Sequence, residues 1–333
     1  MKIVQLVDNQ GKYLIAKVSE PDLILINNFE NVYDLAILAI ESHKSIITLI
    51  EENISENHLD YDEVYYGKSD FKLSLPIFHP KDPRFCMVAG TGLTHKASAE
   101  NRNKMHEAAT NNQATDSMKM YQIGVEGGKP ASGNIGAQPE WFYKGNGSVL
   151  RAHNEHLTIP NYGNDGGEEP EIAAIYINDK NGFPHRIGFT TGNEFSDHVM
   201  EKKNYLYLAP SKIRNCSIGP ELVLTDKFEE LNGKVLIKRN AHIIWEKSIG
   251  TGENNMCHSL QNLEYHHFKY DNHRIPGDLN IHFLGTVGFS FGAGIVLEEG
   301  DEMIVSWENM GRPLVNFLKI DNYEEEMISI KNI

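Results

Sequence analysis

The chain has 333 residues, of which 40% are apolar and 23% charged, as is ordinary for a soluble globular protein. Its 31 Lys and Arg against 46 Asp and Glu give a formal net charge of −15, which argues against nucleic acid and anionic membranes as partners. An anionic small molecule is not excluded, because a local group of lysines overrides the overall field.

Cysteine usage and the first residues indicate the compartment. Cys86, Cys216 and Cys257 are too few and too widely spaced for a disulfide framework or a zinc knuckle, and they fit a reducing cytoplasm. The short apolar run after Lys2 ends at Asp8, too soon for a signal peptide. Because there is also no run of about 18 apolar residues, the sequence predicts a cytoplasmic protein without a membrane span.

The first 80 residues read as a small α/β unit. The runs 2–7 and 13–18 flank "DNQGK" and predict a β-hairpin, and residues 31–53 have the apolar spacing of a helix. Pro76, Pro80 and Pro83 then make a stiff, extended connector. We therefore predict a small N-terminal domain over residues 1–80 and a second domain over residues 83–333.

The second domain reads as strand-rich. Residues 97–109 predict a helix with Ser98 as its cap, and residues 110–150, rich in Gly, Asn and Gln, predict irregular structure. From about residue 168, short β-type runs recur between turn signals: "EIAAIYI", "RIGFTT", "LVLTD", "KVLIKR", "AHIIWEK", "LNIHFLGTVG" and "EMIVSW". This density predicts a β-rich α+β fold with a barrel or rolled sheet.

An acidic pair stands at the start of one such strand. In "GGEEPEIAAIY" (166–176), Glu169 and Glu171 are two residues apart, so on a strand their side chains share a face. Two ionised carboxylates held side by side repel each other, and a positive group is expected between them. Glu194, in "GNEFSDH" after the next strand, adds a third carboxylate.

Three carboxylates form an all-oxygen ligand set. Such a set suits a hard divalent cation, Mg²⁺ or else Mn²⁺ or Ca²⁺, and an octahedral Mg²⁺ would keep positions open for a substrate. The competing interpretation is that the acids lie on a solvated face, which is the commoner fate of an E-x-E pair taken alone.

Other residue types that suit a catalytic site lie in separate blocks. Lys144 and Lys212 could hold a substrate carboxylate or carry the charge of an enolate, and His95 stands next to a predicted helix start, where it could act as a base. The glycine-punctuated segment 283–294 offers backbone amides and Thr286 to an oxyanion or carboxylate. For each of these residues a purely structural role is the alternative.

A group of histidines is a second, weaker candidate for a metal site. His258 and His266 are eight residues apart and could share a helix face, with His267 beside them. No cysteine or close histidine pair completes a tetrahedral set, so zinc is not the favoured interpretation.

The order of these blocks resembles the fumarylacetoacetate hydrolase superfamily. Over residues 83–320 the segments "GTGLTHKASAE", "PEWFYKGNGS", "EEPEIA", "GNEFSDH", "SKIRNCSIGPEL", "PGDLNIHFLGTVGFSFG" and "LEEGDEMIVSWENMGRPLVN" follow the order expected there. "PEWFYKG", "DGGEEPEIA", "GNEFSDH" and "NLEYHHFKY" resemble most the branch of 2-keto-3-deoxy sugar acid dehydratases. The resemblance implies a mixed β-sandwich roll with a small α/β N-terminal domain, and a homodimer or homotetramer.

The resemblance also implies roles for individual residues. Glu169, Glu171 and Glu194 match the metal ligands, although Glu194 stands where the family usually has Asp. Lys212 matches a catalytic lysine, and the substrate-binding positions match Lys144, Gly285 and Thr286. In the histidine block "GLTHKASAE" the family's Tyr is missing, so His95 is expected as the base, with Lys212, Glu100 or a metal-bound water as alternatives.

Three functions follow in order of preference. The first is a Mg²⁺-dependent dehydratase that acts on a 2-keto-3-deoxypentonate through a metal-stabilised enolate and yields 2,5-dioxopentanoate. The second is a hydrolase that uses the same metal site to cleave the C–C bond of a 2,4-diketo acid. The third is a non-catalytic keto-acid-binding protein, since a fold does not fix a function.

Overall fold

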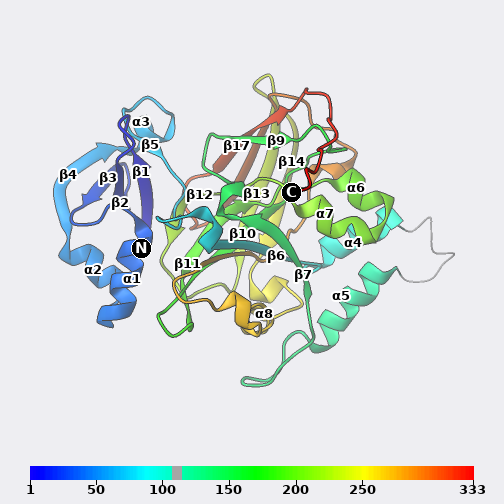
Figure 1. Ribbon diagram of the computed structural model, residues 1–333, viewed down its shortest axis with the longest axis horizontal. Coiled ribbons are helices and arrows are strands. Elements are labelled where there is room, and N and C mark those ends of the chain that lie inside the picture. Colours follow the sequence, from blue (N-terminus) through cyan, green and yellow to red (C-terminus); the bar gives the residue numbers. More distant parts are fainter. Residues whose placement is uncertain (107–114) are drawn as a thin grey trace.

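The computed structural model describes residues 1–106 and 115–333, and two sheets organise it (Figure 1). The larger sheet is mixed, with the order β4 (Ile54–Asp60), β3 (Asp22–Ile26), β2 (Tyr13–Ser19), β1 (Lys2–Val7), β12 (Cys216–Val223), β11 (Pro184–Asn193), β10 (Pro170–Asn178), β15 (Leu279–Phe283), β6 (Cys86–Gly92) and β7 (Glu140–Asn146). Two short strands join it, β5 (Lys72–Leu73) on β1 and β8 (Leu150–Arg151) on β12.

The second sheet and the helices cover the first. The second sheet has the order β14 (His242–Thr251), β13 (Leu231–Arg239), β16 (Glu302–Trp307), β17 (Leu314–Ile320) and β9 (His156–Ile159). The helices are α1 (Val32–Ser42), α2 (Ile46–Glu52), α3 (Tyr61–Tyr65), α4 (Lys96–His106), α5 (Asp116–Gly127), α6 (His198–Lys203), α7 (Leu208–Lys212) and α8 (Leu260–Phe268). The predicted β-rich α+β class is confirmed, and no described helix is long and apolar enough to cross a membrane.

Strand β10 runs through the middle of the core and is buried along its whole length. Its odd-numbered residues Ala173 and Ile175 pack in a cluster with helices α1 and α2, whereas Ile172 and Ala174 pack against the second sheet and α8. Side chains of a strand alternate between its two faces, so a strand covered on both faces reads as a continuous apolar run. This explains why "EIAAIYI" lacks polar alternation.

The N-terminal residues form the predicted hairpin but not the single predicted helix. β1 and β2 pair antiparallel, with Leu6 opposite Leu14. The helix expected over 31–53 is interrupted, because His43 ends α1 in the left-handed region (φ 56°) and the Ser45 side chain caps α2. The prediction of one helix is therefore wrong in this detail.

The N-terminal residues are also joined to the rest of the chain. β1 pairs with β12, and Arg312 lies 3.8 Å above the Tyr61 ring while it makes ion pairs with Glu20 and Asp62. The buried Glu221 accepts a 2.8 Å hydrogen bond from the Tyr61 hydroxyl. These contacts cross the boundary predicted near residue 80, and the division into two domains stays a prediction.

Two predictions over 97–150 need correction. Helix α4 begins at Lys96, so Ser98 lies within the helix and does not cap it, and the last predicted residues, 107–109, lie outside the described residues. The stretch predicted as irregular holds α5, capped by the Thr115 side chain, and β7. Of that stretch, residues 110–114 also lie outside the described part of the chain.

A group of buried histidines lies beside α8. The His267 ring lies 4.6 Å from the His282 ring and 4.9 Å from the His273 ring, and it accepts a hydrogen bond from Trp141 Nε1. His267 Nδ1 is the acceptor, so Nε2 carries the proton and donates to Asn280 Oδ1. Burial and the neighbouring His273 lower the pKa of His267 to about 3, so this ring is neutral at neutral pH.

We predict that His267 makes the protein sensitive to acid. Below the ordinary histidine pKa of about 6.5, the unfolded chain binds a proton that the folded ring refuses, so stability falls as the pH falls. At pH 5 the loss from this residue is about 2 kcal/mol. In urea titrations, His267→Gln should lose less stability between pH 7 and pH 5 than the wild type. An exposed control, His43→Gln, should follow the wild type, and equal pH slopes for all three proteins would contradict the prediction.

Candidate metal centre and active site

The three predicted carboxylates converge. One oxygen from each of Glu169, Glu171 and Glu194 lies within 4.8 Å of the others, and all three side chains are buried. Glu169 and Glu171 stand at the start of β10, and Glu194 follows the end of its antiparallel partner β11. The register places Glu171 opposite Gly192, and the Glu194 amide donates to the Glu169 carbonyl at 2.9 Å. The strand pairing thus brings the acids together.

Lys212 supplies the positive group that the acidic pair requires. Its ammonium, at the end of α7, donates to Glu169 Oε1 at 2.6 Å and to Glu194 Oε2 at 2.6 Å. A third hydrogen bond of 3.0 Å reaches Ser196 Oγ, and the Phe142 ring lies beneath the ammonium. All three N–H donors of Lys212 therefore have partners in a site without bulk water.

Lys144, on β7, joins the same group. Its ammonium lies 2.6 Å from Glu194 Oε1 and donates to the Phe195 carbonyl. The Lys144 side chain is fully buried. Neither lysine therefore extends over the surface into solvent, and both are ionic partners of the carboxylates.

Burial and charge shift the pKa values of these acids in different directions. Burial raises the pKa of Glu169, but Lys212 and His198 outweigh it and hold that pKa well below its usual value. Burial, followed by the negative charges of Glu194 and Glu169, raises the pKa of Glu171 well above the usual value. Burial also raises the pKa of Glu194 to about 7, against the effect of Lys144 and Lys212.

The two lysines also differ. Burial acts against the charged form of Lys212, but Glu169 and Glu194 outweigh it and raise its pKa. Burial lowers the pKa of Lys144, with Glu194 opposing. Lys212 is therefore the firmly protonated member of the pair.

Gly285 and Thr286, two of the three residues predicted to bind substrate, lie against the start of β10. The Gly285 amide donates to Glu171 Oε2 at 2.7 Å, and Thr286 Oγ1 donates to the Pro170 carbonyl at 3.3 Å. Gly285 has φ 104°, and a Cβ there would lie 1.9 Å from Thr94 Oγ1. Only glycine fits this turn, so the backbone can approach the carboxylates closely.

His95 lies beside this turn rather than against the carboxylates. Because Thr94 Oγ1 donates to the Leu284 carbonyl, it accepts from His95 Nδ1, and His95 Nε2 then accepts from the Thr251 hydroxyl at 3.0 Å. Burial lowers the pKa of His95 to about 3. The ring is neutral, and its basic nitrogen is engaged by Thr251.

Glu100 is not brought to the carboxylates. It lies on α4 with an exposed side chain, and its ion pair is with Lys96 at 3.7 Å. The structure therefore offers no support for its predicted role as an alternative base.

Sequence reasoning passed over two buried residues next to the acids. Glu168 accepts hydrogen bonds from the amide and hydroxyl of Ser290, at 2.6 and 2.8 Å. His198 Nε2 lies 3.0 Å from Glu169 Oε1, and its ring stacks on Phe289 at 4.3 Å. Both lie inside the quoted blocks "DGGEEPEIA" and "GNEFSDH", but nothing in their spacing separated them from surface residues.

A buried arginine was also missed. Arg102, on α4, binds both oxygens of Glu140 at 2.7 and 2.8 Å, and its Nε lies 2.6 Å from Glu201 on α6. The three residues come from distant parts of the sequence, so only the folded chain reveals the group. It fixes α4, and with it the His95 turn, against β7 and α6.

The histidine group does not form a metal site. His258 precedes the Ser259 cap of α8, so it does not share a helical face with His266, a possibility that their spacing had left open. Among residues 1–106 and 115–333, the side chains placed for metal binding are Glu169, Glu171 and Glu194. Buried carboxylate oxygens fit a hard divalent cation. The ion pairs of the two ammonium groups with these carboxylates show that the site binds positive charge.

Two curated relatives are similar in sequence, whereas no family model matches the chain. A probable 2-keto-3-deoxyxylonate dehydratase of Haloferax volcanii is 26% identical over 179 residues, 52% of this chain and 58% of the relative. A 2-dehydro-3-deoxy-D-arabinonate dehydratase of Saccharolobus solfataricus is 25% identical over 237 residues, 65% of this chain and 72% of the relative. The match thus spans little more than half the length of the Haloferax protein.

Solved structures show the same architecture over nearly the whole chain. A 2-keto-3-deoxy-D-arabinonate dehydratase complexed with magnesium and 2,5-dioxopentanoate has a TM-score of 0.71 at 21% identity, covering 97% of this chain and 100% of that one. This architecture agrees with the fold that the sequence resemblance to the fumarylacetoacetate hydrolase superfamily implies. A 5-carboxymethyl-2-hydroxymuconate delta-isomerase from Mycobacterium smegmatis shares it at 15% identity and a TM-score of 0.58, with the same coverage of both chains. The resemblance seen in the sequence blocks, including that to the dehydratase branch, is confirmed.

We predict that Lys212→Met destabilises the protein and that a divalent cation reverses much of the loss. Removing one partner of a buried ion pair costs about 3–5 kcal/mol, because Glu169 and Glu194 lose their shared ammonium. A dication replaces that charge. Thermal unfolding with and without Mg²⁺ should therefore show a larger Mg²⁺-induced rise in Tm for the variant than for the wild type. The exposed Lys227→Met serves as control, and an unchanged Tm for Lys212→Met would contradict the prediction.

A second prediction concerns the contact between Glu168 and Ser290. Glu168→Ala leaves the buried Ser290 amide without an acceptor, at a cost of about 1–3 kcal/mol, and the segment 284–294 should open more often. Hydrogen exchange followed by mass spectrometry should show faster exchange in this segment. Glu168→Gln keeps one acceptor oxygen and should exchange more slowly than Glu168→Ala. Identical exchange in all three proteins would show that Glu168 does not hold the segment.

Proposed function

We propose that the protein is a Mg²⁺-dependent carbon–oxygen lyase that dehydrates a 2-keto-3-deoxypentonate to 2,5-dioxopentanoate. The observation that carries the proposal is the buried set of Glu169, Glu171 and Glu194 with its two lysines. The similarity to dehydratases in sequence and fold supports this substrate class. We also propose the two-domain division near residue 80 and a homodimer or homotetramer, which rest on the sequence alone.

The charges of the site suit a keto acid. Three carboxylates and two ammonium groups leave one negative charge when all are ionised, so a bound dication leaves one positive charge, which matches the single carboxylate of the substrate. The three glutamates would hold the cation, which supplies a Lewis acid for the substrate's keto oxygen. The Gly285 amide and the Thr286 hydroxyl lie at the same turn, where they donate to Glu171 and to the Pro170 carbonyl. We assign them to the substrate carboxylate together with Lys144, and both donors exchange these acceptors for the substrate when it binds.

The proton transfers follow from the protonation states. We assign the removal of the C3 proton to His95 Nε2. This nitrogen must first give up its hydrogen bond with the Thr251 hydroxyl, so that it can face the substrate. Lys212, expected from sequence as an alternative base, is firmly protonated and is assigned instead to proton donation at the leaving C4 hydroxyl. One water is lost, which leaves a C3–C4 double bond. A proton then leaves C5 and one is added at C3, so the double bond moves to C4–C5, and the resulting enol takes up a proton at C4 and releases its O–H proton to give the C5 aldehyde.

Cleavage of a 2,4-diketo acid is the competing reaction on this metal site. It needs a histidine and an acid to orient an attacking water. In the described residues Glu100, the acid expected from sequence near His95, is exposed and pairs with Lys96, and this favours dehydration.

We predict that the purified protein with Mg²⁺ converts 2-keto-3-deoxypentonates into a new aldehyde, detected with an aldehyde reagent, and that EDTA abolishes the reaction. Glu171→Gln keeps the acceptor for the Gly285 amide but loses the ligand charge, and kcat should fall about 100-fold or more. The exposed Lys96→Gln should retain activity. Loss of enol absorbance from acylpyruvates without aldehyde formation would assign the site to the hydrolase. Inactivity on both substrate sets, with Mg²⁺ still raising the Tm, would indicate a binding protein.

A further inference from the structure

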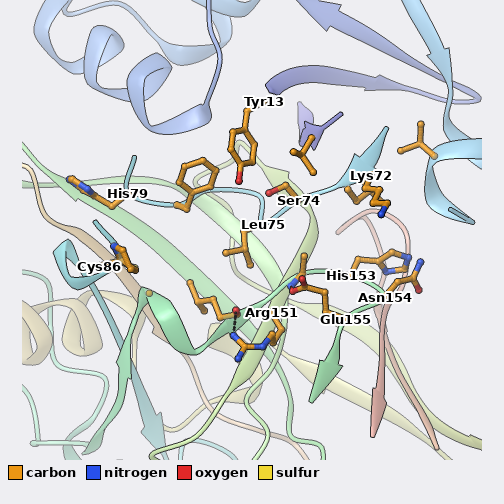
Figure 2. A pocket seen from close by; sticks show the side chains of 18 of the residues that line it. Tyr13, Lys72, Ser74, Leu75, His79, Cys86, Arg151, His153, Asn154 and Glu155 are labelled. Atoms are coloured by element: carbon orange, nitrogen blue, oxygen red, sulfur yellow. Dashed lines mark hydrogen bonds between the residues drawn. The ribbon is translucent and has the colours of Figure 1, made fainter. Parts of the chain in front are cut away.

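A cavity of about 780 Å³ lies away from the carboxylates, between the N-terminal residues and the larger part of the chain. Figure 2 shows Tyr13 and Lys72 on one side of it and Arg151 with Glu155 on the other. None of the residues assigned to the metal or the substrate lines this cavity. Its size lies within the range of about 300–1,000 Å³ typical of small-molecule sites.

One part of the wall is apolar and aromatic. The rings of Tyr13 and Phe78 lie 4.7 Å apart between centroids, and Leu75 and Leu150 line the same space. The four side chains come from both sides of the cavity, so a flat or branched apolar group would contact them together. Such a wall does not suit a 2-keto-3-deoxypentonate, in which every carbon except C3 carries a polar oxygen group.

The charged part of the wall is positive. It contains Lys72 and Arg151 against the single carboxylate of Glu155, which already accepts the Ala152 amide at 2.6 Å. Arg151 Nη1 donates to the carbonyls of Ser148 and Leu150, which fixes the guanidinium while its Nη2 and Nε have no hydrogen-bond partner among the described residues. A fixed guanidinium with free donors is an anion-binding group.

A second cavity of similar size shows that a positive wall is not a property shared by the cavities of this protein. It measures about 680 Å³ and is lined by Glu20, Glu229 and Glu230 against Lys2 and Lys227. Its wall has more carboxylates than lysines, as the chain's net charge of −15 would suggest. The wall of the cavity at Arg151 has the opposite excess, with more positive than negative side chains.

We propose that the cavity at Arg151 binds a small organic anion, a carboxylate or sulfonate on an apolar or aromatic body, distinct from the substrate. The anionic group pairs with Arg151, Lys72 on the opposite side adds to the positive potential of the cavity, and the apolar body lies against Tyr13, Phe78 and the leucines. The wall residue Arg151 belongs to β8, which pairs with β12, and Tyr13 belongs to β2, within the N-terminal residues. A bound anion would therefore bridge the two parts of the chain and raise the stability of the fold.

The experiment uses 8-anilinonaphthalene-1-sulfonate, whose fluorescence rises in an apolar site, titrated into the full chain at 150 mM NaCl. We expect one saturable site per chain and a rise in Tm with the probe. The double variant Lys72→Gln/Arg151→Gln should bind at least about tenfold more weakly, as expected for the loss of charge-assisted contacts. The matched pair Lys2→Gln/Lys227→Gln, in the second cavity, should bind like the wild type.

A single variant and two competing ligands test the role of charge separately. Lys72→Gln alone, an exposed change, should weaken the probe if the double variant fails to fold. Phenylacetate should displace the probe, and the uncharged phenylacetamide should do so at least about tenfold less well. Four results would overturn the proposal: no saturable site, equal losses in both charge variants, equal displacement by acid and amide, or a wild-type dimer that dissociates in Lys72→Gln/Arg151→Gln. The last result would assign this face to a second copy of the chain.

Discussion

The shared hydrogen bonds of Lys212 with Glu169 and Glu194 are the constraint on which the site depends. Burial by itself acts against the charged form of every group there, because water is lost and little replaces it. One ammonium at 2.6 Å from both carboxylates changes this balance, and Lys144 adds a second on Glu194. The charged forms of the acids and of the lysines are therefore stable in this buried site only because they neutralise one another.

The strand geometry decides where this set forms. β10 is covered by α1 and α2 on one face and by the second sheet on the other. Its residues 172–177 therefore carry no charged side chain, and the charged side chains lie at its start. There the polar groups of β10 meet the end of β11, and the pairing of Pro170 with Asn193 places Glu169 beside Glu194. The carboxylates thus lie together at the ends of the two strands, where the chain passes out of the apolar core.

Local patterns were sufficient for part of this arrangement. The i, i+2 spacing of Glu169 and Glu171 on an apolar strand predicted both the shared face and the need for a nearby cation, and the β-type runs predicted the strand-rich class. What could not be predicted came from long-range contacts. Arg102 meets Glu140 and Glu201 only after the chain folds, and the exposure of Glu100 depends on which face of α4 points outward. His43 interrupts a periodic helix through a left-handed backbone that apolar spacing does not register.

The acidic strand start and the glycine-rich segment 284–294 act as one mechanical unit. Two neighbouring acids contact the segment directly, since Glu171 accepts the Gly285 amide and Glu168 accepts Ser290. Glu169 reaches it through His198, whose ring stacks on Phe289. The residues assigned to the metal and those assigned to the substrate carboxylate are thus tied by direct bonds. Groups that share a network do not contribute independently. A change at either end therefore shifts both the held cation and the amides that face the keto acid, which is how a rigid core keeps two halves of one site in register.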